Sequence, residues 1–132
     1  MDYNRLSMLI AVLSKRAGLN LNALDAYVNI AGGLRVTQPA VDLAVCAALI
    51  SAFKNKAIPS DTVIFGEVGL SGEVRAVPQA EERIKEAAKL GFGRVIMPEI
   101  NVNGLKRSGT GVAKLGIQIE GIRYIGELFA VL

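Results

Sequence analysis

The sequence contains no histidine and no tryptophan, and it has a single cysteine, Cys46. Without histidine the chain lacks the usual general base and the commonest metal ligand, which argues against Ser-His-Asp or Cys-His catalysis and against a zinc site. A lone cysteine cannot form an internal disulfide. Because Cys46 lies in an apolar helical pattern, we expect a small core residue rather than a reactive thiol. Any enzyme chemistry would therefore use lysine, serine, threonine or carboxylates.

Long hydrophobic runs are also missing. No stretch reaches the roughly 18 apolar residues that a membrane span requires. The segment after Met1 and Asp2 is amphipathic and has neither the basic start nor the cleavage site of a signal peptide. These absences predict a cytoplasmic protein without a membrane partner. The 132 residues are 52% hydrophobic, which suffices for one domain with a genuine core, so we expect a single domain over residues 1–132.

Apolar residues at helical spacing predict three helices. The first is amphipathic and covers residues 2–17, and the second, over residues 39–53, is apolar on nearly all sides. In the second helix Pro39 occupies a favoured first-turn position, and the sole charge, Asp42, lies where the helix dipole favours it. A third helix is expected over about residues 79–90.

Strand signals surround these helices. Alternating residues and a Gly-Gly turn predict a hairpin over residues 25–36, and the apolar runs at 62–68 and 94–98 are typical of buried strands. Because the third helix lies between the strands expected at 62–68 and 94–98, we expect a βαβ unit. Residues 101–113 are rich in glycine and asparagine and predict a flexible loop, before a final strand and short helix. The fold class is therefore α+β, with a mixed sheet and packed helices.

Two features bear on polyanion binding. The glycine-rich stretch GEVGLSGEV (66–74) is superficially similar to a phosphate-binding loop, but it lacks the Lys-Ser/Thr pair and is interpreted as a turn. The net charge of +3 is compatible with phosphate contact, whereas the 5% aromatic content does not indicate base readout. The candidate DNA-contacting residues, chosen by charge and expected exposure, are Lys54, Lys56, Arg75, Lys85, Lys106 and Arg107.

The order of several motifs resembles that of a known family. NRLSMLIAVL, FGEVGLSGEVRAV, RIKEAAKLGF and RVIMP follow one another as in the carboxy-terminal Lon protease-like domain of the bacterial RadA (Sms) DNA repair and recombination proteins. The resemblance covers about residues 2–130. The ComM and magnesium-chelatase-like family shares the GE-G-L-G spacing, but the opening DYNRLSMLIAVLSKR is more similar to RadA. The resemblance implies a Lon-like fold of the ribosomal-S5-domain-2 kind.

The resemblance also bears on catalysis. In Lon proteases a serine at a helix start attacks the substrate, and a lysine on the helix after the GE strand activates it. The resemblance places these positions on Ala40 and Glu81, so both catalytic groups are missing and proteolysis is not expected. Two alternatives stay open. One is a residual Ser-Lys peptidase that uses, for instance, Ser71 with Lys85, and the other is a pure protein-interaction module with a solvated basic surface.

The family implies a larger parent protein. Its members resemble ATP-dependent, helicase-like machines for branch migration, with a zinc-binding segment and a RecA-like ATPase ahead of this domain. Neither a four-cysteine cluster nor GxxxxGK[ST] occurs in the 132 residues, so the sequence resembles an excised carboxy-terminal domain. ATP, Mg and Zn are expected only in the absent parts, with no cofactor or metal site in this segment. The implied partners are single-stranded or branched DNA, further copies in a hexamer, and a recombinase.

Overall fold

A computed structural model of the chain describes residues 3–17, 39–109 and 111–132. Its α-helices are α1 (Tyr3–Arg16), α3 (Asp42–Lys54), α4 (Ala80–Lys89), α5 (Glu99–Ser108) and α6 (Leu128–Val131). Short 3₁₀ helices are η1 (Pro39–Val41), η2 (Gly111–Leu115) and η3 (Ile125–Glu127). The strands are β1 (Thr62–Ile64), β2 (Glu67–Val68), β3 (Val74–Arg75), β4 (Arg94–Pro98) and β5 (Gln118–Ile122).

The strands form two sheets. Strands β1, β4 and β5 lie side by side in that order and are all parallel, with Val63 opposite Val95 and Val95 opposite Ile119. Strands β2 and β3 form a separate antiparallel hairpin. The chain passes from β1 through the β2–β3 hairpin and helix α4 to the parallel strand β4, so the expected βαβ unit is confirmed with a hairpin inserted in its crossover. In the described part of the chain, a parallel sheet and a hairpin take the place of the single mixed sheet that the sequence predicted. The architecture is compatible with the α+β class.

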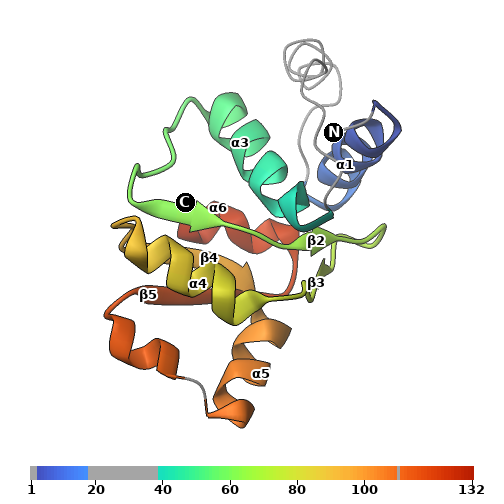
Figure 1. The fold of residues 1–132 in the computed structure, drawn as a ribbon. Coiled ribbons are helices and arrows are strands. Elements are labelled where there is room, and N and C mark those ends of the chain that lie inside the picture. Colours follow the sequence, from blue (N-terminus) through green and yellow to red (C-terminus); the bar gives the residue numbers. More distant parts are fainter. Residues whose placement is uncertain (1–2, 18–38, 110) are drawn as a thin grey trace.

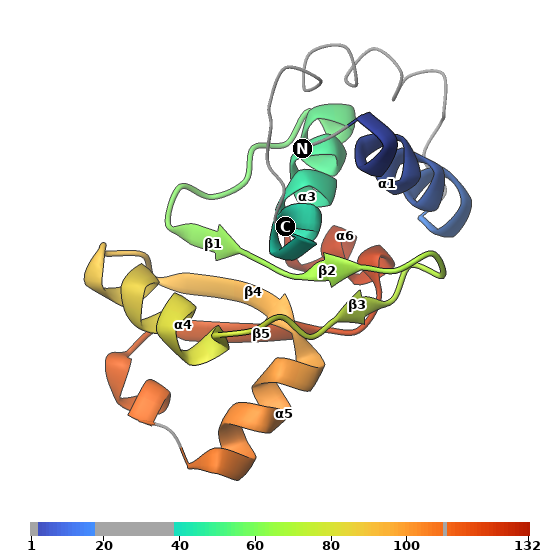
Figure 2. The same cartoon turned by 45° about the vertical axis from the view of Figure 1, so that its right-hand side comes forward.

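Helices cover both faces of the parallel sheet. Ile96 on β4 belongs to a core cluster with residues of α1, α3 and α6, whereas its neighbours Val95 and Met97 pack in a second cluster with Ile84 of α4. This alternation is the period-two pattern of a strand that is buried on both faces. In Figure 1, α1 and α3 lie above the strands and α5 lies below them, and Figure 2 preserves this arrangement.

The predicted helices are confirmed in place and extent. Residues 2–17, 39–53 and 79–90 correspond to α1, to η1 with α3, and to α4, and the predicted terminal strand and helix correspond to β5 and α6. Cys46 is fully buried in the first cluster, as expected of a small core residue. None of the helices in the described ranges combines the length and the apolar character that a bilayer span requires. The hairpin predicted at 25–36 lies outside the described residues.

The expected strand over residues 62–68 is wrong in its continuity. The segment divides into β1 and β2, which belong to different sheets, and Gly66 lies between them. A β-carbon at Gly66 would approach Leu43 Cδ2 to 3.1 Å, so the lack of a side chain lets the chain pass close to α3. The backbone of Gly66 also forms hydrogen bonds with Ala40 and Leu43 at the start of that helix. These contacts fix the point at which the chain leaves one sheet and enters the other.

The predicted flexible loop over 101–113 is also wrong, because these residues form most of α5 and η2. Pro98 precedes α5 with its fixed φ, and Gly109 ends the helix in the left-handed conformation at φ 66°. Between these ends, Val102 and Leu105 pack against the second core cluster. The side chain of Asn101 exchanges hydrogen bonds with the backbone N–H and carbonyl of Val77. Tertiary contacts therefore stabilise a helix whose glycine and asparagine content disfavours it.

Candidate functional site

The start of α3, where the resemblance places the lost nucleophile, is held firmly by the β1–β2 connection. The N–H of Gly66 donates to the carbonyl of Ala40 at 2.8 Å, and the N–H of Leu43 donates to the carbonyl of Gly66 at 3.0 Å. The side chain of Ala40 is buried in the second core cluster. Since a methyl group supplies no hydroxyl, this helix start offers structure and no nucleophile.

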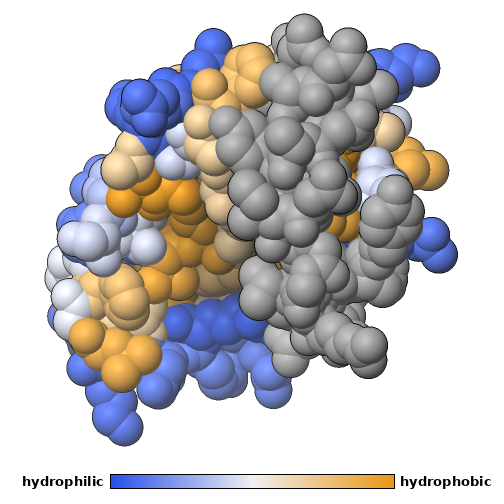
Figure 3. All heavy atoms as spheres, turned by 90° about the horizontal axis from the view of Figure 1, so that it is seen from above, coloured by the Kyte–Doolittle hydropathy of each residue, from blue (hydrophilic) through white to orange (hydrophobic). Residues whose placement is uncertain are grey.

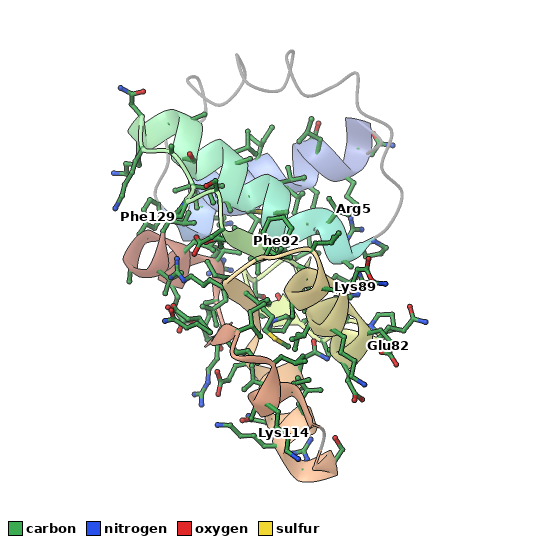
Figure 4. All side chains as sticks on the ribbon, turned by 60° about the vertical axis from the view of Figure 1, so that its left-hand side comes forward. Arg5, Glu82, Lys89, Phe92, Lys114 and Phe129 are labelled. Atoms are coloured by element: carbon green, nitrogen blue, oxygen red, sulfur yellow. The ribbon has the colours of Figure 1, made fainter. Side chains whose placement is uncertain are left out.

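The one acidic residue of α3, Asp42, has a stronger partner than the helix dipole. Asp42 is 0% exposed and accepts hydrogen bonds from Arg5 Nε at 2.6 Å, from Arg5 Nη2, and from the N–H of Val68 at 3.0 Å. Arg5 Nη2 also lies 3.7 Å from Glu67 Oε1. A buried carboxylate requires such pairing because removing it from water is costly. Figure 4 shows Arg5 on α1 beside the first turn of α3.

This buried charge also affects Cys46. Burial raises the pKa of the Cys46 thiol to about 12, and the neighbouring Asp42 carboxylate adds to the rise. The thiol therefore stays protonated at neutral pH, where only the thiolate is nucleophilic. This confirms the structural interpretation of Cys46.

A groove of about 600 Å³ runs between the start of α3, strand β1 and helix α4. Its walls are mostly apolar, and Gln79, Glu82, Arg83 and Glu86 supply the polar groups. A second hollow of about 380 Å³ shares Ala40, Gln79 and Arg83 with it. Hydrophobic surface gathers in a hollow on the face seen from above in Figure 3. The groove has the concave, mainly apolar form that is usual for binding sites.

The basic group beside Ala40 is Arg83. It lines both hollows, its Nε donates to the carbonyl of Pro78 at 3.0 Å, and its guanidinium lies 5.7 Å from the centroid of the Phe65 ring. Glu81 is not among the residues that line either hollow. Its carboxylate instead pairs with Lys85 Nζ at 2.9 Å, an i,i+4 pair along α4. A guanidinium is a poor proton acceptor, so Arg83 does not replace the amine of a Ser-Lys dyad.

The six candidate DNA-contacting residues are exposed but lie in four separate places, at the end of α3, on β3, on α4 and at the end of α5. Lys54 and Lys56 are at the end of α3, where Lys54 Nζ lies 5.4 Å from the Phe129 ring centroid. Lys106 and Arg107 form the last turn of α5, at the opposite end of the molecule in Figure 1. Figure 4 shows the same separation between Phe129 and Lys114, which follows α5 in the chain. The remaining two, Arg75 and Lys85, form ion pairs with Glu73 and Glu81.

The β2–β3 turn carries Ser71, the nucleophile of the alternative hydrolase. The N–H of Gly72 donates to the carbonyl of Gly69, and the N–H of Ser71 donates to Glu73 Oε1, both at 3.0 Å. The pKa of Glu73 lies below its ordinary value because its own backbone N–H, Arg75 and the N–H of Ser71 favour the ionised form. Lys85 lies on α4 and is paired with Glu81. The described contacts therefore do not join Ser71 to Lys85.

No cluster of three or more histidine, cysteine, aspartate or glutamate side chains in the described ranges could hold a metal ion. Sequence reasoning missed Arg5 and Arg83. The signal for Arg5 was the unpaired charge of Asp42 in an otherwise apolar helix. Arg83 gave no signal of its own, because α4 carries five other charged residues and only tertiary structure distinguishes Arg83 from them.

Comparison with known proteins identifies a family to which the chain belongs and several similar proteins. A family model described as subunit ChlI of Mg-chelatase matches residues 7–101. The chain is similar to proteins named DNA repair protein RadA. It is 44% identical to that of Synechocystis sp. over 131 residues, 99% of this chain and 24% of the relative. The Escherichia coli protein is 43% identical over 131 residues, 99% of this chain and 27% of the relative. The Rickettsia bellii protein is 59% identical over 95 residues, 72% of this chain and 21% of the relative. The chain spans about a quarter of the length of these relatives.

Proposed function

The chain belongs to the family described as subunit ChlI of Mg-chelatase. From this and from its similarity to proteins named DNA repair protein RadA, we propose that it serves as a non-proteolytic Lon-like scaffold domain of a DNA repair protein of the RadA type. In this role it holds copies of the protein together in a ring and contacts DNA. ATP hydrolysis and branch migration are proposed for the whole protein, and they require groups outside this chain. We expect the protein to act in the cytoplasm, where a recombinase is a further expected partner.

The observation that carries the proposal is the start of α3. It retains the geometry of a well-built helix N-terminus. At the position where a Lon protease has a nucleophilic serine, however, this chain has the buried methyl group of Ala40. Arg83 provides the neighbouring positive charge and cannot accept a proton from an attacking hydroxyl. The loss of a peptidase dyad with retention of its surroundings supports a structural role.

Two observations support assembly and DNA contact. Leu70 on the β2–β3 turn is 74% exposed and Leu90 at the end of α4 is 66% exposed, so both side chains are accessible to another protein surface. Head-to-tail contacts between copies form a ring when the rotation from one copy to the next closes. The exposed lysines and arginines at the ends of α3 and α5 supply point charges for phosphates.

Peptide turnover tests the proposal against the residual-hydrolase alternative. The wild-type chain is expected to show no turnover of a fluorogenic peptide above background. Turnover that is abolished by Ser71→Ala would contradict the proposal and support the Ser71–Lys85 dyad. Ser71 is exposed on a turn, so its replacement removes no core contact and a loss of turnover would report on chemistry.

The alternative of a pure protein-interaction module is tested with DNA. Neutralising several phosphates releases counterions, so the affinity for an oligonucleotide should fall linearly with salt concentration on a log-log plot. An interaction module with a solvated basic surface predicts no such binding. The variant Lys106→Ala/Arg107→Ala should reduce the slope, because two exposed charges of one helix end are removed together.

A further inference from the structure

A hollow of about 370 Å³ lies where the β2–β3 hairpin, helix α5 and the end of β5 meet. Its lining includes Glu99, Asn103, Arg123 and Tyr124. We call this hollow the Tyr124 slot. It lies apart from the groove beside Ala40, with which it shares no lining residue. Its volume exceeds that of one nucleobase.

The aromatic wall of the slot is both exposed and fixed. Tyr124 is 58% exposed, which is unusual for a large ring without a partner surface. Its backbone is held on two sides, by a bridge to Glu73 of the hairpin and by a hydrogen bond of 2.7 Å from its N–H to Glu127 Oε2. The N–H of Ile125 donates to the carbonyl of Gly72 at 2.9 Å. A ring that is ordered before binding loses little entropy when a ligand stacks on it.

Arg123 lines the slot, and two further arginines lie on or against the adjoining β2–β3 hairpin. Arg123 precedes Tyr124, lines the slot and takes part in no ion pair recorded for the described residues. Arg75 is anchored to Glu73 Oε2 at 3.1 Å on the adjoining strand. Arg16 packs its aliphatic stem against the hairpin, since a β-carbon on Gly72 would lie 3.1 Å from Arg16 Cβ. Arginines beside an exposed aromatic ring are the arrangement by which proteins hold phosphates while a base stacks.

Helix α5 supplies hydrogen-bonding side chains to the lining of the slot. Glu99 lies in the first turn of α5 and takes part in no ion pair recorded for the described residues, and Asn103 follows it one helical turn later. A carboxylate accepts hydrogen bonds and repels carbonyl oxygens, so it favours a base with an exocyclic amino group. Cytosine offers such a group, whereas thymine presents carbonyl oxygens on both sides of its single N–H.

We propose that the Tyr124 slot binds one unpaired base of single-stranded DNA, stacked on Tyr124, with the flanking phosphates held by Arg123, Arg75 and Arg16. The amino group of the base is read by Glu99. The inference deepens the DNA contact of the proposed function and rests on it. It also places base contact at one site of a chain whose low aromatic content gave no indication of base readout.

Fluorescence anisotropy with labelled oligonucleotides of cytosine, of thymine and of abasic sites tests the inference. Tyr124→Ala should weaken binding of the cytosine oligonucleotide roughly 5- to 100-fold, and Tyr124→Phe should restore most of it because the ring face remains. Phe129→Ala is the matched control, since Phe129 is also an exposed aromatic beside a cation but lies on α6. Glu99→Gln should remove the preference for cytosine over thymine.

The outcomes separate the two proposals. If the wild-type chain binds the cytosine oligonucleotide but Tyr124→Ala and Phe129→Ala weaken it equally, the slot is overturned and DNA contact elsewhere stands. Equal affinity for cytosine and abasic oligonucleotides would likewise overturn the slot. If no oligonucleotide binds at any salt concentration, the proposed DNA contact fails together with the slot. Melting curves that match the wild type ensure that each variant is folded.

Discussion

Arg5 on α1 and Asp42 at the start of α3, which are 37 residues apart in sequence, form an ion pair around a carboxylate that is fully buried. The same carboxylate accepts the N–H of Val68 on β2. One buried charge therefore connects the first helix, the central helix and the hairpin. Its position two residues after Ala40 explains why the helix start is well ordered although it carries no catalytic group.

The first prediction concerns this ion pair. Arg5→Met leaves the Asp42 carboxylate buried without its cation, which should lower the free energy of unfolding by about 3–5 kcal/mol. Urea denaturation followed by circular dichroism measures the change. Lys85→Met is the control, because it removes an exposed ion pair worth less than about 1 kcal/mol. Equal effects of the two substitutions would contradict the structural role of Arg5.

A second prediction compares two glycines. A β-carbon at Gly121 on β5 would lie 3.0 Å from the backbone Cα of Glu99, whereas Gly104 in α5 has nothing within 4 Å. Gly121→Ala should therefore destabilise the protein by about 1–3 kcal/mol through overpacking. Gly104→Ala should stabilise it by up to about 1 kcal/mol, because alanine is the better helix former. Thermal melts of both variants measure the signs, and a stabilising Gly121→Ala would show that β5 and α5 pack less closely than described.

The third prediction concerns Cys46. Its pKa is raised from the usual 9.0 to about 12, so folding favours the protonated thiol. The resulting stability is fully present below pH 9 and is lost as the pH rises from 9 toward 12. At pH 8 the native chain should react with a thiol reagent far more slowly than the chain unfolded in urea. Rapid labelling under native conditions would mean that the helix packing around Cys46 opens readily.

A fourth prediction tests whether chemistry can be restored at the start of α3. Ala40→Ser returns the hydroxyl but leaves Arg83 as the neighbouring basic group, so peptide turnover should stay at background. The double variant Ala40→Ser/Arg83→Lys supplies an amine that can accept a proton. Turnover by the double variant alone would identify position 83 as the site of the lost general base. Turnover by Ala40→Ser alone would contradict the inertness assigned to Arg83.

Much of the fold could be predicted from local patterns. Helices α1, α3 and α4 have apolar residues at helical spacing, and β4 lies between clear breaks, so their own sequences suffice. Helix α5 was missed because Gly104 and its asparagines disfavour a helix locally, and packing of Val102 and Leu105 outweighs this preference. Strand 62–68 was overextended because its interruption at Gly66 depends on the approach of Leu43.

The sites were harder to predict than the elements. The Ala40 position came from motif order, but its neighbour Arg83 depends on how α4 lies against α3. The Tyr124 slot combines a turn, a helix that the sequence did not indicate and the end of a strand, so no short motif describes it. Assignment of phosphate contacts by charge and expected exposure selected Arg75 and omitted Arg16 and Arg123, because contact with the hairpin or with the slot becomes visible only in three dimensions.

The central claim is that this chain contacts DNA and does not hydrolyse peptides, and salt-dependent binding of a labelled single-stranded oligonucleotide tests it most directly. The account predicts that the affinity falls linearly with salt on a log-log plot, with a slope of about −0.7 for each phosphate neutralised. Neutralisation of four phosphates would thus give a slope near −3. Binding that is absent at low salt, or an affinity that does not change with salt, would contradict the account.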